Sequence, residues 1–389
     1  MKLPGVLMVT GAYWPELSGG GLQCRTMIQA LRDRFRFRVL TTCTDRRLPS
    51  ADLVDGVPVT RVYVDVARAH TKVIAAIATV WFFLRHHREF DLVHLHGFSQ
   101  KSVLLVLLAR VWRKRVMITI HTAGQDEPDA IKRLGRMAFW SYASADCFVA
   151  ISEAMAGNYR RSGLPASRLR VVPNGIDTNR FAPPSDDERR AAKASFAQLP
   201  QAVPWVLFVG FFSADKAPDV LFESWRAIQP SAPASALLFV GATASRYHEV
   251  DASLADSIRA GAAAAGLADR VLCAGEVPDV ERAYRAADIF VMPSTREAFG
   301  MALLEGMSSG LPCIASRLDG VTDEIVGEDA GVLTPPRDVP ALASALSGLL
   351  QGPGRRAELG VRARARVVER YGLEASAIRW ADLYAQVLK

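Results

Sequence analysis

A chain of 389 residues is too long for one ordinary doubly wound domain and suits two domains of roughly 180 residues each. Half of the residues are hydrophobic and 22% are charged, and no low-complexity tract is present, which is typical of a globular protein. Five widely spaced cysteines without a C-x-x-C pair argue against a disulfide scaffold or a cysteine zinc site and favour a reducing, cytoplasmic compartment.

The net charge of +7 is confined to one part of the sequence. Between residues 66 and 118, nine lysines and arginines face two acidic residues, an excess equal to that of the whole chain. Such a balance is used to bind nucleic acid, a membrane surface or an anionic substrate. Because the excess is local and no nucleic-acid-binding module is recognisable, we expect no nucleic-acid partner.

Short apolar segments alternate with longer helical segments, which predicts a parallel α/β architecture. In the first half, the predicted strands cover residues 6–10, 38–42, 59–64, 92–96, 116–121, 147–151 and 169–172. In the second half, they cover residues 205–210, 236–240, 271–274, 289–292, 313–315 and 331–334. Helices are expected between the strands, for example over 22–34, 218–227 and 302–309.

The chain changes character after Pro173-Asn174-Gly175, where a proline-rich and charged segment precedes a fresh strand. We therefore predict an N-terminal Rossmann-like domain over 1–178 and a C-terminal one over 179–372. The tail 373–389 has apolar residues at helical spacing and is expected to pack back on the first domain as an amphipathic helix. Two facing parallel sheets would place a ligand at the carboxyl ends of the strands, in a deep interdomain cleft.

Candidate residues in the first domain follow its strands. Gly19-Gly20-Gly21 opens a helix, where glycine lets the backbone approach a phosphate, although such a triplet is more often only a tight turn. His94 and His96 end one strand, and no third ligand falls at metal-binding spacing, so hydrogen bonding within the fold is the better interpretation for His94. His121, at the tip of the next strand, is the stronger functional candidate.

The second domain carries a lysine and two carboxylates at strand ends. Lys216 lies between a strand and a helix start, where a cation suits a diphosphate, although an exposed loop lysine would look the same. Glu297 follows another strand, and Glu305 lies two turns into the next helix. Gly300 can bring backbone N–H groups up to a phosphate, while the carboxylates accept hydrogen bonds from sugar and ribose hydroxyls. Glu305 lies in an apolar run, which does not fit a merely solvated glutamate.

The order of these motifs resembles that of the nucleotide-sugar glycosyltransferases of the GT-B fold, specifically the large retaining family four (glycosyl transferases group one). The resemblance covers nearly the whole chain. It comprises the glycine loop, His94-x-His96, His121, Ser152-Glu153, the run Val-Pro-Asn-Gly-Ile-Asp at 172–177, the Lys216 loop, Ala274-Gly275, Ala287-Asp288 and the stretch from Glu297 to Glu305.

This resemblance implies an activity. A sugar, of hexosyl type, would pass from a nucleotide-diphosphate sugar, with UDP- or GDP-sugar preferred, to a sugar or lipid-linked acceptor such as a polysaccharide or glycolipid precursor. Retention of configuration and the lack of a bound metal or other cofactor are implied in the same way. The family's donor-binding positions are matched here by Gly20, Gly210, Lys216, Gly275, Val277, Glu297, Phe299, Gly300, Met301 and Glu305.

The resemblance implies catalytic roles for three of the matched positions. Lys216 would neutralise the diphosphate leaving group, Glu297 would lie near the transferred sugar, and His121 is the histidine beside that sugar. Glu305 would bind the donor ribose.

One position departs from the family. Phe211 stands where members usually carry an arginine, so one diphosphate cation is missing, and either another cation such as Arg317 or a weaker diphosphate site has to compensate.

The basic stretch and the competing functions leave alternatives open. Two apolar segments, 73–84 and 103–112, end in aromatic and basic residues, as interfacial helices attracted to anionic lipid do, but each could instead bury one face in the core. Residues 66–118 are thus compatible with a peripheral position at the inner face of a membrane and with a phosphorylated acceptor.

Two alternative functions stay open. One is a non-catalytic nucleotide-sugar-binding partner subunit, which Phe211 favours, and the other is a nucleotide-sugar epimerase.

Overall fold

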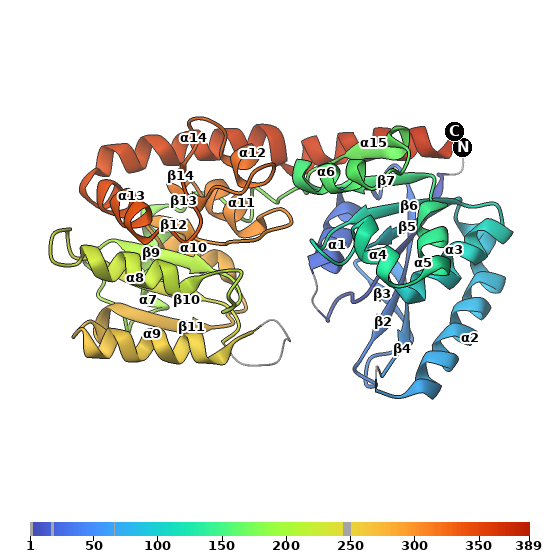
Figure 1. Ribbon diagram of the computed structural model, residues 1–389, viewed down its shortest axis with the longest axis horizontal. Coiled ribbons are helices and arrows are strands. Elements are labelled where there is room, and N and C mark those ends of the chain that lie inside the picture. The colour runs from blue at the N-terminus through green and yellow to red at the C-terminus, as the bar shows by residue number, and fades with distance from the viewer. Residues whose placement is uncertain (1–2, 17–18, 66, 244–249) are drawn as a thin grey trace. The chain divides into compact units, whose positions relative to one another are not determined.

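The computed structural model describes residues 3–16, 19–65, 67–243 and 250–389 (Figure 1). The chain forms two compact units, Met1–Gly175 with Leu373–Lys389, and Ile176–Gly372. Each unit is built on its own sheet with helices packed against it, and nearly all neighbouring strands run parallel. The predicted class, α/β with Rossmann-like units, is therefore confirmed.

The described residues of the first unit form eight strands, and its helices include the last one of the chain. The strands are β1 (Gly5–Thr10), β2 (Arg36–Cys43), β3 (Ala51–Val54), β4 (Val57–Tyr63), β5 (Leu92–His96), β6 (Arg115–Ile120), β7 (Cys147–Ala150) and β8 (Leu169–Val171). The helices are α1 (Gly19–Leu31), α2 (Ala69–His86), α3 (Gln100–Val111), α4 (Pro128–Arg133), α5 (Arg136–Ala143), α6 (Glu153–Arg161) and α15 (Leu373–Leu388), with short 3₁₀ turns η1 (His87–Glu89) and η2 (Ala166–Arg168). The strand order is β3-β4-β2-β1-β5-β6-β7-β8.

β3 has no counterpart among the predicted strands. It pairs antiparallel with β4 through Asp55 and Gly56, which have φ values of 51° and 80°, the positive values of a tight hairpin turn. Three of its four residues are exposed at the edge of the sheet, so no alternation of buried and exposed positions marks it. The Asp-Gly pair between apolar residues was the signal that could have identified this hairpin.

The core of the first unit joins the beginning and the end of the chain. Trp380, Leu383 and Tyr384 of α15 belong to the same buried cluster as Val6 and Met8 of β1. These three positions recur at helical spacing, so one face of α15 is buried, as the apolar pattern of the tail predicted. In Figure 1, α15 therefore lies against the first unit although it follows the second unit in sequence.

In the second unit, the part of the chain that the structure describes forms six parallel strands. They are β9 (Trp205–Val209), β10 (Ala236–Val240), β11 (Val271–Gly275), β12 (Ile289–Met292), β13 (Cys313–Ser316) and β14 (Val332–Thr334). The helices are α7 (Asp186–Ala194), α8 (Pro218–Ile228), α9 (Ala252–Ala264), α10 (Val280–Ala286), α11 (Met301–Ser308), α12 (Thr322–Val326), α13 (Val339–Gln351) and α14 (Pro353–Tyr371), with the turn η3 (Ala268–Arg270). The strand order is β11-β10-β9-β12-β13-β14.

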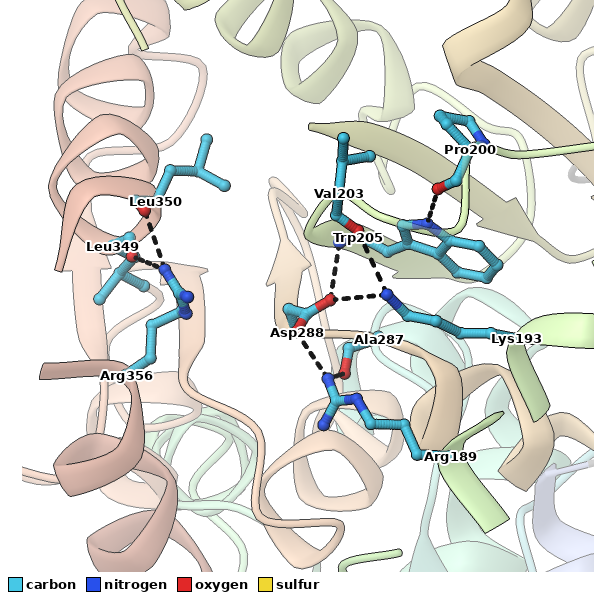
Figure 2. Close-up of polar contacts among 10 residues, drawn as sticks. All are labelled: Arg189, Lys193, Pro200, Val203, Trp205, Ala287, Asp288, Leu349, Leu350 and Arg356. Carbon is cyan, nitrogen blue, oxygen red and sulfur yellow. Dashed lines mark hydrogen bonds and ion pairs between the residues drawn. The ribbon is translucent and has the colours of Figure 1, made fainter. Parts of the chain in front are cut away.

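Asp288, directly before β12, connects three segments at the amino ends of the strands (Figure 2). Its carboxylate accepts hydrogen bonds from the Trp205 N–H at 2.8 Å and from Arg189 of α7 at 2.6 Å, and Lys193 Nζ lies 3.5 Å away. Arg189 also donates to the carbonyl of Ala287 at 2.7 Å. Because ligands of such sheets bind at the opposite, carboxyl ends of the strands, the Ala287-Asp288 motif holds the fold together.

Replacing Asp288 with alanine is expected to destabilise the second unit by about 3 kcal/mol. The Trp205 N–H and two half-buried cations would lose their shared acceptor. Urea unfolding measures the change, with Asp279→Ala as the control, because Asp279 forms an exposed ion pair with Arg282. Equal losses in the two variants would contradict the structural role of Asp288.

Candidate active site

The strand order of the second unit locates a binding crevice. β9 lies between β10 and β12, so the chain leaves the end of β9 toward one side of the sheet and the end of β12 toward the other. Ligands of open parallel sheets bind outside the carboxyl ends of strands at such a switch point. The loop after β9 carries Lys216, and the loop after β12 carries Glu297. Two residues that are 81 positions apart in sequence therefore meet here.

Lys216 and Glu297 form an ion pair at this switch point. Lys216 Nζ lies 2.6 Å from Glu297 Oε1, and Ser294 Oγ donates a hydrogen bond to the same oxygen at 2.8 Å. The side chains are 29% and 10% exposed, respectively, so the lysine keeps more access to solvent than its partner. Ser294 was not among the predicted residues, although it lies three positions before Glu297.

Two further contacts join the same loops. The Thr295 N–H donates to the carbonyl of Asp215 at 2.7 Å, and Arg296 forms an exposed ion pair with the Asp215 carboxylate at 2.7 Å. The backbone around Lys216 is thus fixed before any ligand binds, which lowers the cost of ordering it on binding.

Two helices begin at the ends of these loops. α8 begins after Ala217, which has a left-handed φ of 48°, and α11 begins after Gly300, which has a φ of 105°. The first N–H groups of a helix have no partner within the helix and favour an anion. Because Pro218, the first residue of α8, has no N–H group, the two helices contribute chiefly the positive ends of their dipoles, and Lys216 supplies the formal positive charge of the crevice. This is the arrangement that a diphosphate requires.

Glu305, in α11, lies beside the hydroxyl of Tyr284 in α10. The Tyr284 hydroxyl lies 2.8 Å from Glu305 Oε2, to which it donates, and 3.1 Å from the carbonyl of Ala302. Burial raises the pKa of Glu305 to about 7, although the Tyr284 hydrogen bond and the charge of Arg180 act in the opposite direction. The residue keeps part of its surface accessible. Glu305 can thus exchange a proton near neutral pH and accept hydrogen bonds from a ligand.

The ends of β9, β10 and β11 approach one another closely at glycines. The Gly210 N–H donates to the Val240 carbonyl, and the Gly241 N–H donates to the Gly275 carbonyl, each at 2.9 Å. Gly241 has a φ of 142°, and a Cβ there would lie 1.9 Å from the Gly210 carbonyl oxygen, so no other residue fits. Gly241, which the sequence analysis missed, therefore holds two predicted positions, Gly210 and Gly275, in place.

The remaining predicted donor positions lie at the ends of β11 and β12. Val277 is half-buried in the loop after β11, and Met301 is half-buried at the start of α11. Phe299 is buried, with its ring 6.1 Å from that of Tyr371, so its side chain packs in the core. Any contact of Phe299 with a donor would have to come from its backbone.

In the first unit, the strand order brings Gly20 and His121 together. β1 lies between β2 and β5, so the start of α1 and the end of β5 meet at a second switch point. A Cβ on Gly20 would lie 3.8 Å from His96 Cβ and 3.9 Å from His121 Cδ2. His96 Nδ1 and His121 Nε2 are 3.0 Å apart, with their rings stacked. Burial lowers the pKa of His121 to about 4, so its imidazole is neutral near pH 7.

His94 and Asp126 support this histidine pair. His94 is buried between the Tyr384 hydroxyl and Thr119 Oγ1, each 2.7 Å from one of its ring nitrogens, which agrees with the hydrogen-bonding role predicted for it. Asp126, which the sequence analysis missed, accepts hydrogen bonds from the N–H groups of Phe98, His121 and Thr122 at 2.9–3.1 Å. Asp126 thereby fixes the backbone at the tip of β6.

The predicted residues thus form two sets, one in each unit. Gly20 and His121 lie in the first unit, and the other predicted positions lie in the second. Within the described ranges, no group of three or more histidine, cysteine, aspartate or glutamate side chains is arranged to hold a metal ion.

Comparisons with known proteins identify the family of each unit. Residues 17–180 match the family model described as Glycosyltransferase Family 4, and residues 203–352 match the one described as Glycosyl transferases group 1. The chain is 32% identical to the D-inositol 3-phosphate glycosyltransferase of Xylanimonas cellulosilytica, over 77% of this chain and 73% of that protein. It is 29% identical to the lipopolysaccharide core biosynthesis mannosyltransferase LpsB of Rhizobium meliloti, over 56% of this chain and 61% of that protein.

A solved structure agrees with the fold. Alr3699/HepE of Anabaena, in complex with UDP and glucose, matches with a TM-score of 0.79 at 18% identity, covering 98% of this chain and 100% of that one. At this identity the likeness shows the fold alone, which is GT-B. From the two family models and the relative at 32% identity, the chain belongs to the glycosyltransferases of family 4, the glycosyl transferases group 1.

Proposed function

We propose that this glycosyltransferase moves a hexosyl group from a nucleotide-diphosphate sugar to a sugar or lipid-linked acceptor, with retention of configuration and without a bound metal ion. The observation that carries the proposal is the Lys216–Glu297 pair at the switch point of the second unit, flanked by the first turns of α8 and α11. In this transfer the bond between C1 of the sugar and the diphosphate oxygen breaks, and its electron pair leaves with the diphosphate. The acceptor hydroxyl oxygen forms the new bond to C1, and its proton passes to the departing diphosphate.

Charge stabilisation of the departing diphosphate is the main requirement of this step. Lys216 is the cation that we assign to it, and the positive ends of the dipoles of α8 and α11 add to it. Glu297 Oε1 is already engaged by Lys216 and Ser294, so we assign Glu297 to positioning the lysine and binding a sugar hydroxyl. His121, as a neutral imidazole, would hydrogen-bond a sugar hydroxyl, and Glu305 would accept from the ribose diol.

UDP is the first nucleotide to test, and GDP is the second. The Anabaena structure of the same fold holds UDP, and the two relatives by sequence are named for transfer to an inositol phosphate and for mannosyl transfer in lipopolysaccharide synthesis. We therefore propose a phosphorylated or lipid-linked acceptor, met in the cytoplasm at the inner face of a membrane.

The alternative is a non-catalytic partner subunit that binds a nucleotide sugar. Phe211 favours it, because the family's usual arginine beside the diphosphate is missing.

Thermal unfolding with UDP, GDP, ADP and dTDP, each with EDTA and with Mg²⁺, tests the donor site. A diphosphate at 100 times its dissociation constant should stabilise the fold by about 2.7 kcal/mol, and EDTA should not remove the effect. Release of the diphosphate from a matching sugar donor in the presence of an acceptor would then identify the enzyme, and the anomeric configuration of the product would test retention. Stabilisation without release from any donor would favour the partner subunit, and the lack of stabilisation by all four would contradict the donor site.

A further inference from the structure

The helix α2 exposes an apolar stripe on the first unit. Five large apolar side chains, each 50–65% exposed, follow one another at helical spacing on this helix: Val73, Ile74, Ile77, Trp81 and Leu84. They lie within twelve residues, about 16 Å along the helix axis, and fall within a sector of about 100° around it. Isolated exposed apolar residues are common on proteins, but a continuous stripe of five with a tryptophan marks an interaction surface.

The two apolar segments of the basic stretch differ in their burial. In α3, five residues are buried, among them Leu105, Val106 and Leu108, so this helix covers the core. In α2, the buried residues are Thr71, Phe82 and Phe83. α2 packs against β4 and α3 with that narrow face, and Figure 1 shows it at the margin of the sheet. Core packing therefore accounts for most of the apolar residues of α3, of which Val111 at its end is exposed, and leaves the stripe on α2 unexplained.

Cations flank the stripe at both ends. Lys72 lies at its N-terminal end, and Arg85 and Arg88 lie at its C-terminal end, all three exposed and, within the described part of the chain, without an ion pair. The sequence contains no acidic residue between Asp65 and Glu89, and both of these acids pair with other side chains. At the N-terminal end, Lys101 of α3 adds another positive charge near Lys72, and burial lowers the pKa of Lys101. No described helix is both long and apolar enough to cross a bilayer.

We propose that α2 docks the protein on an anionic bilayer surface, with the stripe inserted among the acyl chains and Lys72, Arg85 and Arg88 at the lipid phosphates. A stripe of tryptophan and branched aliphatic side chains between unpaired cations has the chemistry of an interfacial helix, and an anionic lipid surface supplies both of its complements. A protein partner would have to match both features on a single face. The inference rests on the proposed function only in placing a lipid-linked acceptor at this surface.

Flotation of the full chain with lipid vesicles tests the proposal. The wild type is expected to bind vesicles of phosphatidylglycerol and phosphatidylcholine and not vesicles of phosphatidylcholine alone. Ile77→Ser/Trp81→Ser should weaken binding roughly 100-fold, because it removes the deepest apolar contacts. Arg85→Glu/Arg88→Glu should weaken it by at least roughly 25-fold, as expected for the loss of two cations near an anionic surface.

Matched variants make the test specific. Ile378→Ser removes an exposed isoleucine from α15, and Arg355→Glu/Arg362→Glu makes the same charge change on α14, and both should bind like the wild type. Equal binding by all variants, or binding that ignores lipid charge, would overturn the proposal. A dimer would also overturn the proposal, provided that the wild type forms it in light scattering without binding vesicles and that Ile77→Ser/Trp81→Ser dissociates it. In that case a second copy of the chain covers the stripe. Thermal stabilisation by UDP is measured on each variant as well. It tests the donor site of the proposed function independently of vesicle binding, so a failure of one proposal can be told from a failure of the other.

Discussion

Replacing Lys216 with methionine is expected to lower kcat by about 100- to 1,000-fold, the size of effect seen when one group that stabilises a developing negative charge is removed. The dependence on this lysine should be strong, because Phe211 stands where the family's second cation would be. Methionine keeps most of the volume of the side chain, so the change isolates the charge. Steady-state rates and the affinity for the diphosphate product measure the two parts of the effect.

Two further variants control this experiment. Lys216→Arg keeps the charge and the contact with Glu297, and we expect it to recover most of the lost rate. Arg296→Ala removes a cation from the neighbouring loop, where Arg296 is 63% exposed and pairs with Asp215, and it should change kcat by less than about 5-fold. If Lys216→Met and Arg296→Ala reduced kcat equally, the loss would come from disturbing the two loops, and the assignment of Lys216 to the leaving group would fail.

Four of the predicted candidate residues share one property, which is that they lie in the segment that follows a strand. Lys216, Glu297, Gly20 and His121 each follow an apolar segment that was recognisable as a strand. In parallel sheets the ligand site lies at that end of the strands, so a local pattern was enough to propose them. Contact between Lys216 and Glu297 then follows from β9 and β12 being neighbours in the sheet.

Residues that act through long-range packing could not be predicted in this way. Tyr284 meets Glu305 because α10 packs against α11, and nothing in the sequence around Tyr284 indicates this contact. Asp126 lies in a loop, and its three backbone partners come from two different strand ends. On α2, the apolar pattern predicted a helix correctly but could not show which of its faces is buried, because nearly all of its middle positions are apolar.

Replacing Glu305 with glutamine is expected to stabilise the second unit at pH 8 and to weaken its binding of UDP. The pKa of Glu305 in the folded state, about 7, lies above its ordinary value near 4.5. The folded state therefore binds the proton more tightly than the unfolded state does, so the free energy of unfolding falls as the pH rises from about 4.5 through 7. A difference of this size corresponds to about 3 kcal/mol at pH 8. Glutamine carries no charge to bury, and its oxygen can still accept from Tyr284.

Thermal unfolding of both proteins between pH 5 and pH 8 measures this effect. The variant should be closest in stability to the wild type at pH 5, just above the ordinary pKa of a glutamate, and should exceed it by a growing margin as the pH rises to 8. The difference in stability between the two proteins at each pH cancels the titration of all other groups, including the buried histidines of the first unit. A difference in stability that stays constant over this range would contradict the raised pKa.

The affinity for UDP should change with pH in the opposite direction to the stability of the empty protein. Ribose hydroxyls donate to the ionised form, so affinity should rise roughly tenfold between pH 6 and pH 8 as Glu305 loses its proton. The phosphates of UDP also titrate in this range, but they do so equally for both proteins, and the ratio of the two affinities cancels their contribution. At pH 8 the glutamine variant should bind about 10- to 100-fold more weakly, as expected when a charge-assisted hydrogen bond becomes a neutral one. In the empty site, the ionised carboxylate lowers the stability of the fold. When a ligand with hydroxyl groups binds, the same carboxylate increases the affinity. This combination distinguishes a ribose site from a glutamate with a purely structural role. If the affinity ratio does not change with pH, Glu305 acts only in the fold.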